Sequence, residues 1–170
     1  MSKGNIYLIP TTIGPTRTEE VIPGEVIQIA TSLRYFIVEN VKTARRYLRK
    51  LDRSFPINDS TFFELNRRTD ATELRSFITP ALNGFDIGVM SEAGCPGIAD
   101  PGAEIIGIAH QMGIRVKPFV GPSSIFLALM SSGFSGQEFT FHGYLPKERK
   151  DQIFKLKKFE QDCRRTGFTH

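Results

Sequence analysis

The sequence predicts an α/β protein with a mostly parallel sheet and helices on both faces. Short apolar runs typical of buried strands alternate along the chain with segments whose apolar residues recur at helical spacing. Strands that alternate with helices favour a parallel sheet covered on both sides. The chain has 170 residues, of which 40% are hydrophobic and 24% charged, so it is long enough to bury one core.

The predicted strands are apolar runs bounded by turn residues. In chain order they cover residues 5–10, 35–39, 61–65, 87–90, 114–120 and 139–145. Between them, helical spacing predicts helices over 26–33, 41–51, 70–82, 101–112 and 125–130. Asp70 opens one of these as a cap and Pro80 disturbs its end. The helix over 125–130 is apolar all round, which predicts that it is buried.

Charge is concentrated in two clusters, although the chain as a whole carries only +4. The first cluster follows the second strand, and its cations are spaced three and four apart, on one side of a helix. Its members are Lys42, Arg45, Arg46, Arg49, Lys50 and Arg53. The second cluster lies in residues 147–165. Two interpretations stay open for such runs: a solvated helix face, or a surface for an anionic partner such as RNA.

Composition and cysteine usage indicate a cytoplasmic protein without a metal. The two cysteines, Cys95 and Cys163, have neither metal-ligand spacing nor the density of a disulfide framework. No apolar window approaches the length of a membrane span. Pro146 marks the first break in the pattern, which predicts an α/β domain over 1–146 and a basic helical segment over 147–170.

Three loops at predicted strand ends favour a ligand site. Residues 10–16, 91–100 and 121–124 are rich in Gly, Pro, Ser or Thr, and ligands of parallel sheets bind beyond the carboxyl ends of strands. The chain contains neither a Gly-Lys-Ser/Thr P-loop nor a G-x-G-x-x-G after its first strand. A ligand held by close backbone contacts therefore fits better than a nucleoside triphosphate or a dinucleotide.

Motifs at these loops, and one further along the chain, resemble in order and spacing those of the tetrapyrrole methylase superfamily. They are YLIPTTIG (7–14), SEAGCP (91–96), ADPG (99–102), GPSS (121–124) and FHGYLPK (141–147). Within that superfamily the chain is most similar to the ribosomal RNA small subunit methyltransferase I branch, which methylates a ribose 2′-oxygen of small-subunit rRNA with S-adenosylmethionine (SAM). The resemblance covers nearly the whole chain.

The resemblance implies a two-domain fold, usually a homodimer, with SAM in a cleft between the domains. It assigns cofactor contacts to Pro10, Gly94, Cys95, Ile98, Ser123 and Ser124. Amides at a helix start suit the SAM carboxylate, and glycine permits close backbone approach, so the residues themselves agree with this assignment. The branch continues well past residue 170 with a second domain. The resemblance therefore implies that residues 147–170 are a linker helix and the start of a largely absent C-terminal domain, and the present chain by itself is expected to hold only part of the site.

The substrate side departs from the branch pattern. Residues 39–42 read Glu-Asn-Val-Lys where Glu-Asp-Thr-Arg is usual, and 63–67 read Phe-Glu-Leu-Asn-Arg in place of His-Glu-His-Asn-Glu. A ribose hydroxyl must lose its proton during transfer, so Glu39 and Glu64, each at a predicted strand end, are candidate bases. The candidates for RNA contact are Lys42, Arg45, Arg46, Arg49 and Asn66. Two alternatives remain: transfer to a tetrapyrrole or other non-RNA acceptor, and a non-catalytic SAM- or RNA-binding module.

Overall fold

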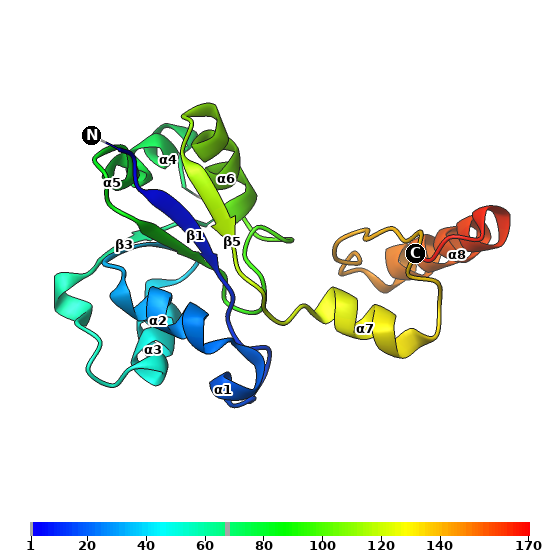
Figure 1. Ribbon diagram of the computed structural model, residues 1–170. Coiled ribbons are helices and arrows are strands. Elements are labelled where there is room, and N and C mark those ends of the chain that lie inside the picture. The colour runs from blue at the N-terminus through cyan, green and yellow to red at the C-terminus, as the bar shows by residue number, and fades with distance from the viewer. Residues whose placement is uncertain (1, 67–68) are drawn as a thin grey trace. The chain divides into compact units, whose positions relative to one another are not determined.

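The computed structural model describes residues 2–66 and 69–170, and the chain divides after Ser123 into two compact units. The first unit contains a five-stranded sheet in the order β3-β2-β4-β1-β5. All four strand pairings are parallel, and helices cover both faces (Figure 1). The α/β class predicted from the sequence is confirmed.

The five strands of the sheet lie inside the predicted apolar runs. They are β1 (Asn5–Ile9), β2 (Tyr35–Val38), β3 (Thr61–Glu64), β4 (Ile87–Met90) and β5 (Arg115–Pro118). The central strand β4 is buried at every position, which explains its unbroken apolar sequence. Side chains alternate between the faces, so that in β2 Phe36 and Val38 enter one core and Ile37 enters the other.

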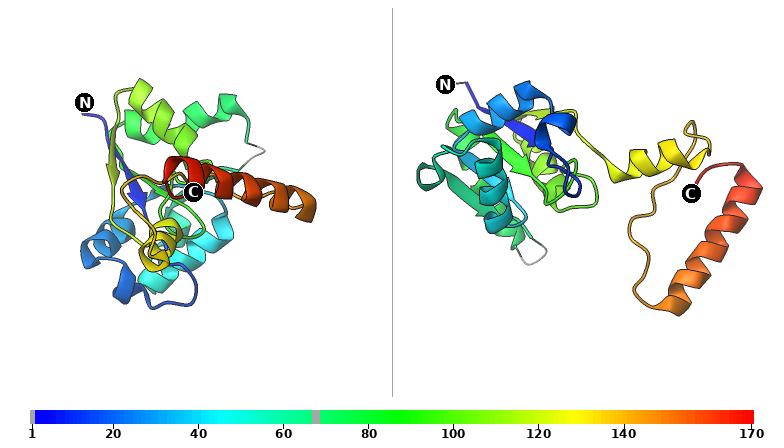
Figure 2. Two further views of the ribbon diagram at one scale, coloured as in Figure 1. Left: turned by 90° about the vertical axis from the view of Figure 1, so that its right-hand side faces the viewer. Right: turned by 90° about the horizontal axis from the view of Figure 1, so that it is seen from below.

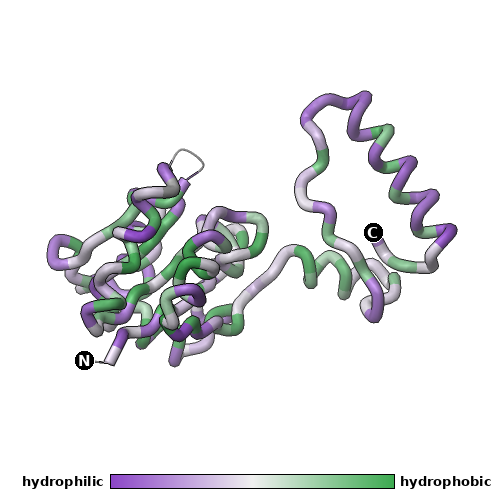
Figure 3. The backbone as a smooth tube through the Cα atoms, turned by 90° about the horizontal axis from the view of Figure 1, so that it is seen from above, coloured by the Kyte–Doolittle hydropathy of each residue, from purple (hydrophilic) through white to green (hydrophobic). Residues whose placement is uncertain are grey.

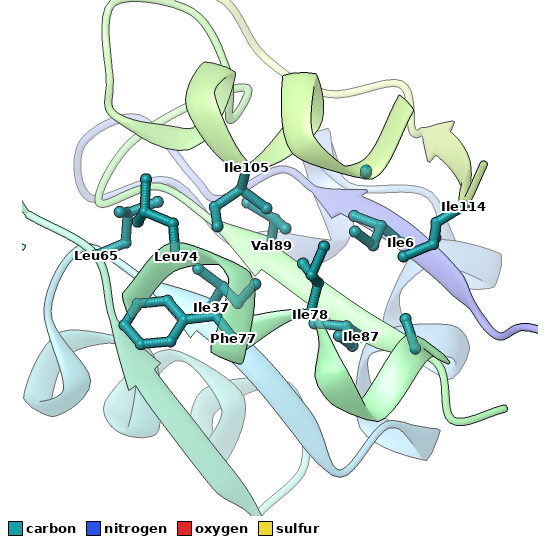
Figure 4. Packing of buried hydrophobic residues seen from close by; sticks show 12 residues of the cluster. Ile6, Ile37, Leu65, Leu74, Phe77, Ile78, Ile87, Val89, Ile105 and Ile114 are labelled. Carbon is teal, nitrogen blue, oxygen red and sulfur yellow. The ribbon is translucent and has the colours of Figure 1, made fainter. Parts of the chain in front are cut away.

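One face of the sheet packs against α2 (Gly24–Ser32) and α3 (Val41–Leu51), with the short α1 (Thr18–Val21) before them and a 3₁₀ turn, η1 (Ile57–Asp59), after them. The other face packs against α4 (Ala71–Phe77), α5 (Thr79–Leu82) and α6 (Gly102–Gln111), as the two views of Figure 2 also show. Figure 4 shows Ile37, Val89 and Ile6 of the sheet packed against Ile78 and Ile105 of this second layer. Each helix layer thus has its own core.

Proline interrupts the helix predicted over 70–82. Asp70 caps α4 as expected, because its carboxylate accepts a hydrogen bond from the Thr72 amide at 2.8 Å. The helix ends at Phe77, and Ile78 separates it from α5. Pro80 lies in the first turn of α5, where a backbone N–H has no partner within the helix, so its absence costs nothing.

Asn40 caps α3, the helix that carries the first basic cluster. Its Oδ1 accepts hydrogen bonds from the amides of Lys42 at 3.0 Å and Thr43 at 3.1 Å. We expect Asn40→Ala to lower the free energy of unfolding by about 1 kcal/mol, because it leaves two amides without this acceptor. Urea denaturation should detect the loss, and Asn40→Ser should recover most of it. Equal stability of the alanine and serine variants would contradict the capping role.

The second unit contains α7 (Ser124–Ser132) and α8 (Arg149–Thr166) and corrects two predictions. The helix expected to be buried has no buried residue, and Phe126 and Met130 are 56% and 79% exposed. The strand expected over 139–145 is wrong as well, since only Phe139 pairs, in an isolated bridge with Thr169. An apolar pattern predicts burial only if enough of the fold is available to cover the side chains. A unit of this length covers its apolar residues only in part.

Among the described residues, 2–66 and 69–170, no helix combines the length and apolarity needed to cross a membrane.

Candidate functional site

Three loops meet where β1, β4 and β5 end, at the carboxyl edge of the sheet. Thr11, after β1, and Gly94, after β4, exchange two backbone hydrogen bonds of 3.0 and 3.2 Å. Gly121, after β5, lies so close to Pro10 that a Cβ at this position would overlap the proline ring. The motifs that sequence analysis singled out in this unit are therefore brought together by the strand order.

Asp100 holds the loop after β4 in shape. Its carboxylate accepts hydrogen bonds from the amides of Gly97 at 2.9 Å and Gly102 at 2.7 Å, and so ties the loop to the start of α6. Burial raises the pKa of this carboxyl, and these backbone hydrogen bonds oppose the rise. The neighbouring Ala99 has a φ of 61°, an uncommon conformation for a residue with a Cβ. The loop is therefore tightly constrained.

Cys95 points from the same loop toward the residues after β5. Its Sγ lies 3.6 Å from the Gly121 carbonyl oxygen and 3.4 Å from that of Pro122. Burial raises the pKa of this thiol, which keeps it in the neutral form. A neutral, half-buried thiol beside two carbonyl oxygens suits packing and weak hydrogen bonding better than nucleophilic attack.

A small pocket of about 50 Å³ opens beside these loops. Its walls come from the loop after β1, the end of β2, the first turns of α3 and the end of β4. The polar groups that line it are Thr11, Thr12, Glu39, Asn40, Thr43, Tyr47, Ser91 and Glu92. Of the two carboxylates proposed as bases, this pocket includes Glu39.

Glu39 is fixed by the loop after β4. Its Oε1 accepts a hydrogen bond of 2.9 Å from the Glu92 amide. Burial raises the pKa of the Glu39 carboxyl, the hydrogen bond from Glu92 opposes this, and the negative charges of Asp100 and Glu92 add to the rise. A carboxylate with a raised pKa inside a pocket is a candidate proton acceptor.

The raised pKa predicts that Glu39→Gln stabilises the protein at neutral pH. The folded protein binds the Glu39 proton more tightly than the unfolded chain does, so stability is lost as the pH rises from 4.5, the ordinary value, through the raised one. Glutamine avoids this loss and still offers an oxygen to the Glu92 amide. We expect a gain below about 1 kcal/mol at pH 7, since solvent screens a partly exposed carboxylate.

The Glu39→Gln gain should vanish on acidification, because wild-type Glu39 then carries its proton in both states. Thermal unfolding followed by circular dichroism across the pH range measures both parts of the prediction. A variant that is less stable than the wild type at pH 7, or equally more stable at every pH, would contradict it.

Tyr47 and Thr43 complete the pocket and were missed from the sequence. The Tyr47 hydroxyl donates a hydrogen bond of 3.3 Å to the Pro10 carbonyl oxygen, and burial raises its pKa to about 12. The Thr43 hydroxyl lies 3.3 Å from Glu92 Oε1. A polar stripe that begins at the α3 cap was the signal that could have identified them. It consists of Asn40, Thr43 and Tyr47, which are spaced three and four residues apart.

The cofactor residues predicted from the resemblance have different environments. Pro10 and Gly94 are buried, Cys95 and Ser123 are half-buried, and Ile98 is 53% exposed. Ser124 belongs to the second unit, where it begins α7 and contributes to a cavity of about 340 Å³ formed within that unit. Among the residues of 2–66 and 69–170, no group of three or more His, Cys, Asp or Glu is arranged to hold a metal ion.

The residues predicted to contact RNA lie mostly on α3. Lys42, Arg45, Arg46 and Arg49 are all exposed, and the Arg45 guanidinium lies over the Phe62 ring, 5.1 Å from its centroid. Asn66 is half-buried beyond β3, and its side-chain amide donates to Glu64 Oε1 at 3.1 Å. Glu64 is exposed on the edge strand and does not line the pocket that contains Glu39. Arg67, in the same motif, lies outside the described residues.

Several curated proteins named ribosomal RNA small subunit methyltransferase I are similar to the chain. The one from Vibrio cholerae serotype O1 is 30% identical over 161 residues, which are 93% of this chain and 53% of the relative. That of Escherichia coli O157:H7 is 28% identical over 96% of this chain and 54% of its own length. For Bacillus subtilis strain 168 the identity is 29%, over 93% of this chain and 52% of the relative.

These comparisons confirm the resemblance to the ribosomal RNA small subunit methyltransferase I branch. The chain spans about half the length of the curated relatives it matches. No family model matches the chain.

Proposed function

We propose that this chain is the part of a SAM-dependent methyltransferase that presents the cofactor loops and the acceptor pocket, and that the acceptor is a ribose 2′-oxygen of small-subunit ribosomal RNA. The observation that carries the proposal is the meeting of three loops at the carboxyl edge of the sheet, beside a pocket that contains Glu39. Relatives named as rRNA methyltransferases support the reaction and the substrate class.

The residues at the loop junction fit SAM. Gly94, with a φ of 77°, and Gly121 let three backbone segments approach one another more closely than side chains would allow. The carbonyl oxygens of Gly121 and Pro122 are directed into the junction toward Cys95, and such oxygens favour a sulfonium cation. Ser123, half-buried at the end of the third loop, offers a hydroxyl donor for a carboxylate. When bound, SAM supplies the electrophilic methyl group.

Glu39 is our candidate for the proton acceptor. Its raised pKa makes it a better base than an exposed carboxylate, and its hydrogen bond with the Glu92 amide holds one oxygen in place. The pocket places Thr12, Asn40 and Tyr47 around it, polar groups that can orient a ribose hydroxyl. The exposed cations of α3 begin at Lys42, three residues after Glu39, and suit the phosphates on either side of the target ribose. Alignment of acceptor and methyl group supplies most of the acceleration.

Two measurements test the proposal. Calorimetric titration of S-adenosylhomocysteine tests the cofactor, and incubation of the protein, extended to the length of its relatives, with small ribosomal subunits and radiolabelled SAM tests transfer. We expect label in 2′-O-methylated nucleosides after nuclease digestion, and a loss of label in Glu39→Gln with cofactor binding retained. Binding without transfer would favour a non-catalytic module. Label on a tetrapyrrole but not on RNA would favour the other acceptor class.

The proposal also includes a homodimer, which the resemblance implies, and a cytoplasmic location, which the cysteine usage favours. The exposed apolar side chains of the second unit, such as Phe126 and Met130, support a further contact surface. Sedimentation equilibrium of the extended protein tests the oligomeric state, and a monomer at micromolar concentration would remove this part of the proposal.

A further inference from the structure

The outward side of α8 combines cations with one exposed aromatic ring. Residues three, four and seven apart share one side of a helix, and here they are Lys150, Phe154, Lys157, Lys158, Arg164 and Arg165. We call this set the basic face of α8. All six side chains are exposed, and Phe154 is 71% exposed. Figure 3 shows α8 as mostly hydrophilic, with isolated hydrophobic positions.

The opposite side of α8 explains why these residues face solvent. Phe159 stacks on His142, with ring centroids 4.0 Å apart, and Cys163 is half-buried beside it on the helix. Gln152, on the same side, donates a hydrogen bond of 2.8 Å to the Pro146 carbonyl oxygen. These contacts fix the rotation of α8 about its axis within its own unit. As a result, the basic face points to solvent.

The lysines of this face are available to a polyanion. Among the described residues, Lys150, Lys157 and Lys158 form no ion pair. Arg164 and Arg165 pair with Glu160 and Asp162 of the same helix, but exposed pairs of this kind contribute little and exchange readily with phosphate. From Lys150 to Arg165 the helix rises about 22 Å, enough to follow several phosphates of a nucleic-acid strand.

We propose that the basic face of α8 is a docking surface for single-stranded RNA, in which the cations contact phosphates and Phe154 stacks on a base. The choice of RNA as the polyanion rests on the proposed function. Proteins that bind single strands combine cations that contact the backbone with aromatic side chains on which bases stack. A membrane surface fits less well, because insertion requires a broad apolar side. The exposed apolar residues of α8 are Ile153, Phe154 and Leu156, and Lys157 lies between Ile153 and Phe154 around the helix.

Fluorescence anisotropy with a short labelled single-stranded RNA tests the inference. We expect the combined variant Lys150→Ala, Lys157→Ala and Lys158→Ala to bind about 10-fold more weakly or worse, and the slope of log affinity against log salt to fall by about 2, at roughly 0.7 per lost phosphate contact. The matched control removes the same charge elsewhere, from the exposed Arg17, Arg75 and Arg115. An equal loss in the control would overturn the inference, since net charge alone would then explain binding.

Phe154 provides a second, charge-neutral test. Phe154→Ala should weaken binding by about 5- to 100-fold, since a stacked base contributes at this level, while the salt slope stays unchanged. Phe154→Tyr should retain affinity. Unchanged affinity in the alanine variant, or capture of the chain by phosphatidylserine vesicles without RNA binding, would sink the proposed stacking surface.

The same assay separates this inference from the proposed function. A variant with Lys42, Arg46 and Arg49 of α3 changed to alanine tests the surface beside the pocket. If that variant alone loses RNA, the α8 surface is rejected and the methyltransferase proposal stands. If S-adenosylhomocysteine fails to bind while α8 variants still lose RNA, the proposed function fails and the α8 surface stands.

Discussion

Gly121→Val is expected to reduce the affinity for S-adenosylhomocysteine by about 100-fold or more. A Cβ on Gly121 would overlap the Cβ and Cγ of Pro10. The proline ring is closed onto its own backbone and cannot turn away, so the loops after β1 and β5 must separate. Separated loops lose their close backbone contacts with the cofactor, and a loss of about 2.8 kcal/mol of binding free energy is a 100-fold change in affinity. Calorimetric titration measures the loss, and circular dichroism verifies that the variant is folded.

Gly107→Ala is the matched control. Gly107 lies in α6, and nothing would contact an added Cβ within 4 Å. Alanine should therefore leave cofactor affinity unchanged and raise stability by about 0.5–1 kcal/mol, because glycine weakens a helix interior. A folded Gly121→Val protein that binds the cofactor as tightly as the control would show that the junction of the three loops is not the cofactor site.

Phe36→Ala should destabilise the first unit by about 3–5 kcal/mol, a large share of the stability of an ordinary domain. Phe36 is fully buried on β2, stacks on Phe62 with centroids 5.3 Å apart, and meets Phe55 edge to face at 5.9 Å. Its removal leaves a cavity between the sheet and α3 that these rings fill only in part.

The chain offers a convenient probe for this measurement. It contains no tryptophan, and three of its four tyrosines, Tyr7, Tyr35 and Tyr47, lie in the first unit, so tyrosine fluorescence during urea denaturation reports mainly on that unit. Phe85→Ala is the control, since Phe85 is 53% exposed and should cost about 1 kcal/mol or less. Similar midpoint shifts for the two variants would contradict the assigned core.

Local pattern predicted the strands well because each strand carries its own signal. β2 and β4 are apolar runs; polar residues bound them on both sides, Arg34 and Glu39 at β2 and Asp86 and Ser91 at β4. The same kind of signal failed at α7 and at residues 139–145, where apolar side chains are present but the unit that holds them leaves most of them exposed. Sequence periodicity indicates which apolar residues share one face of an element. Whether that face is buried depends on which other elements pack against it.

The candidate site was predictable only in pieces. Glycine and proline at the three loops were visible in the sequence, but the hydrogen bonds between Thr11 and Gly94 depend on β4 lying beside β1, which is a property of strand order. Glu39 and Glu64 looked equivalent as strand-end acids. The topology separates them, because β2 neighbours the central strand β4 whereas β3 is an edge strand, and the pocket forms beside the former.

The position of β4 between β2 and β1 also governs when the sheet can assemble during synthesis. β1 pairs with β4 and β5, and β2 pairs with β3 and β4. Without β4, the pair β1–β5 therefore has no hydrogen bond to the pair β2–β3. Parallel strands joined over long sequence separations close slowly. The first strand translated is thus among the last to find a partner, and a nascent chain must keep its apolar β1 from aggregating until residues 87–90 have left the ribosome.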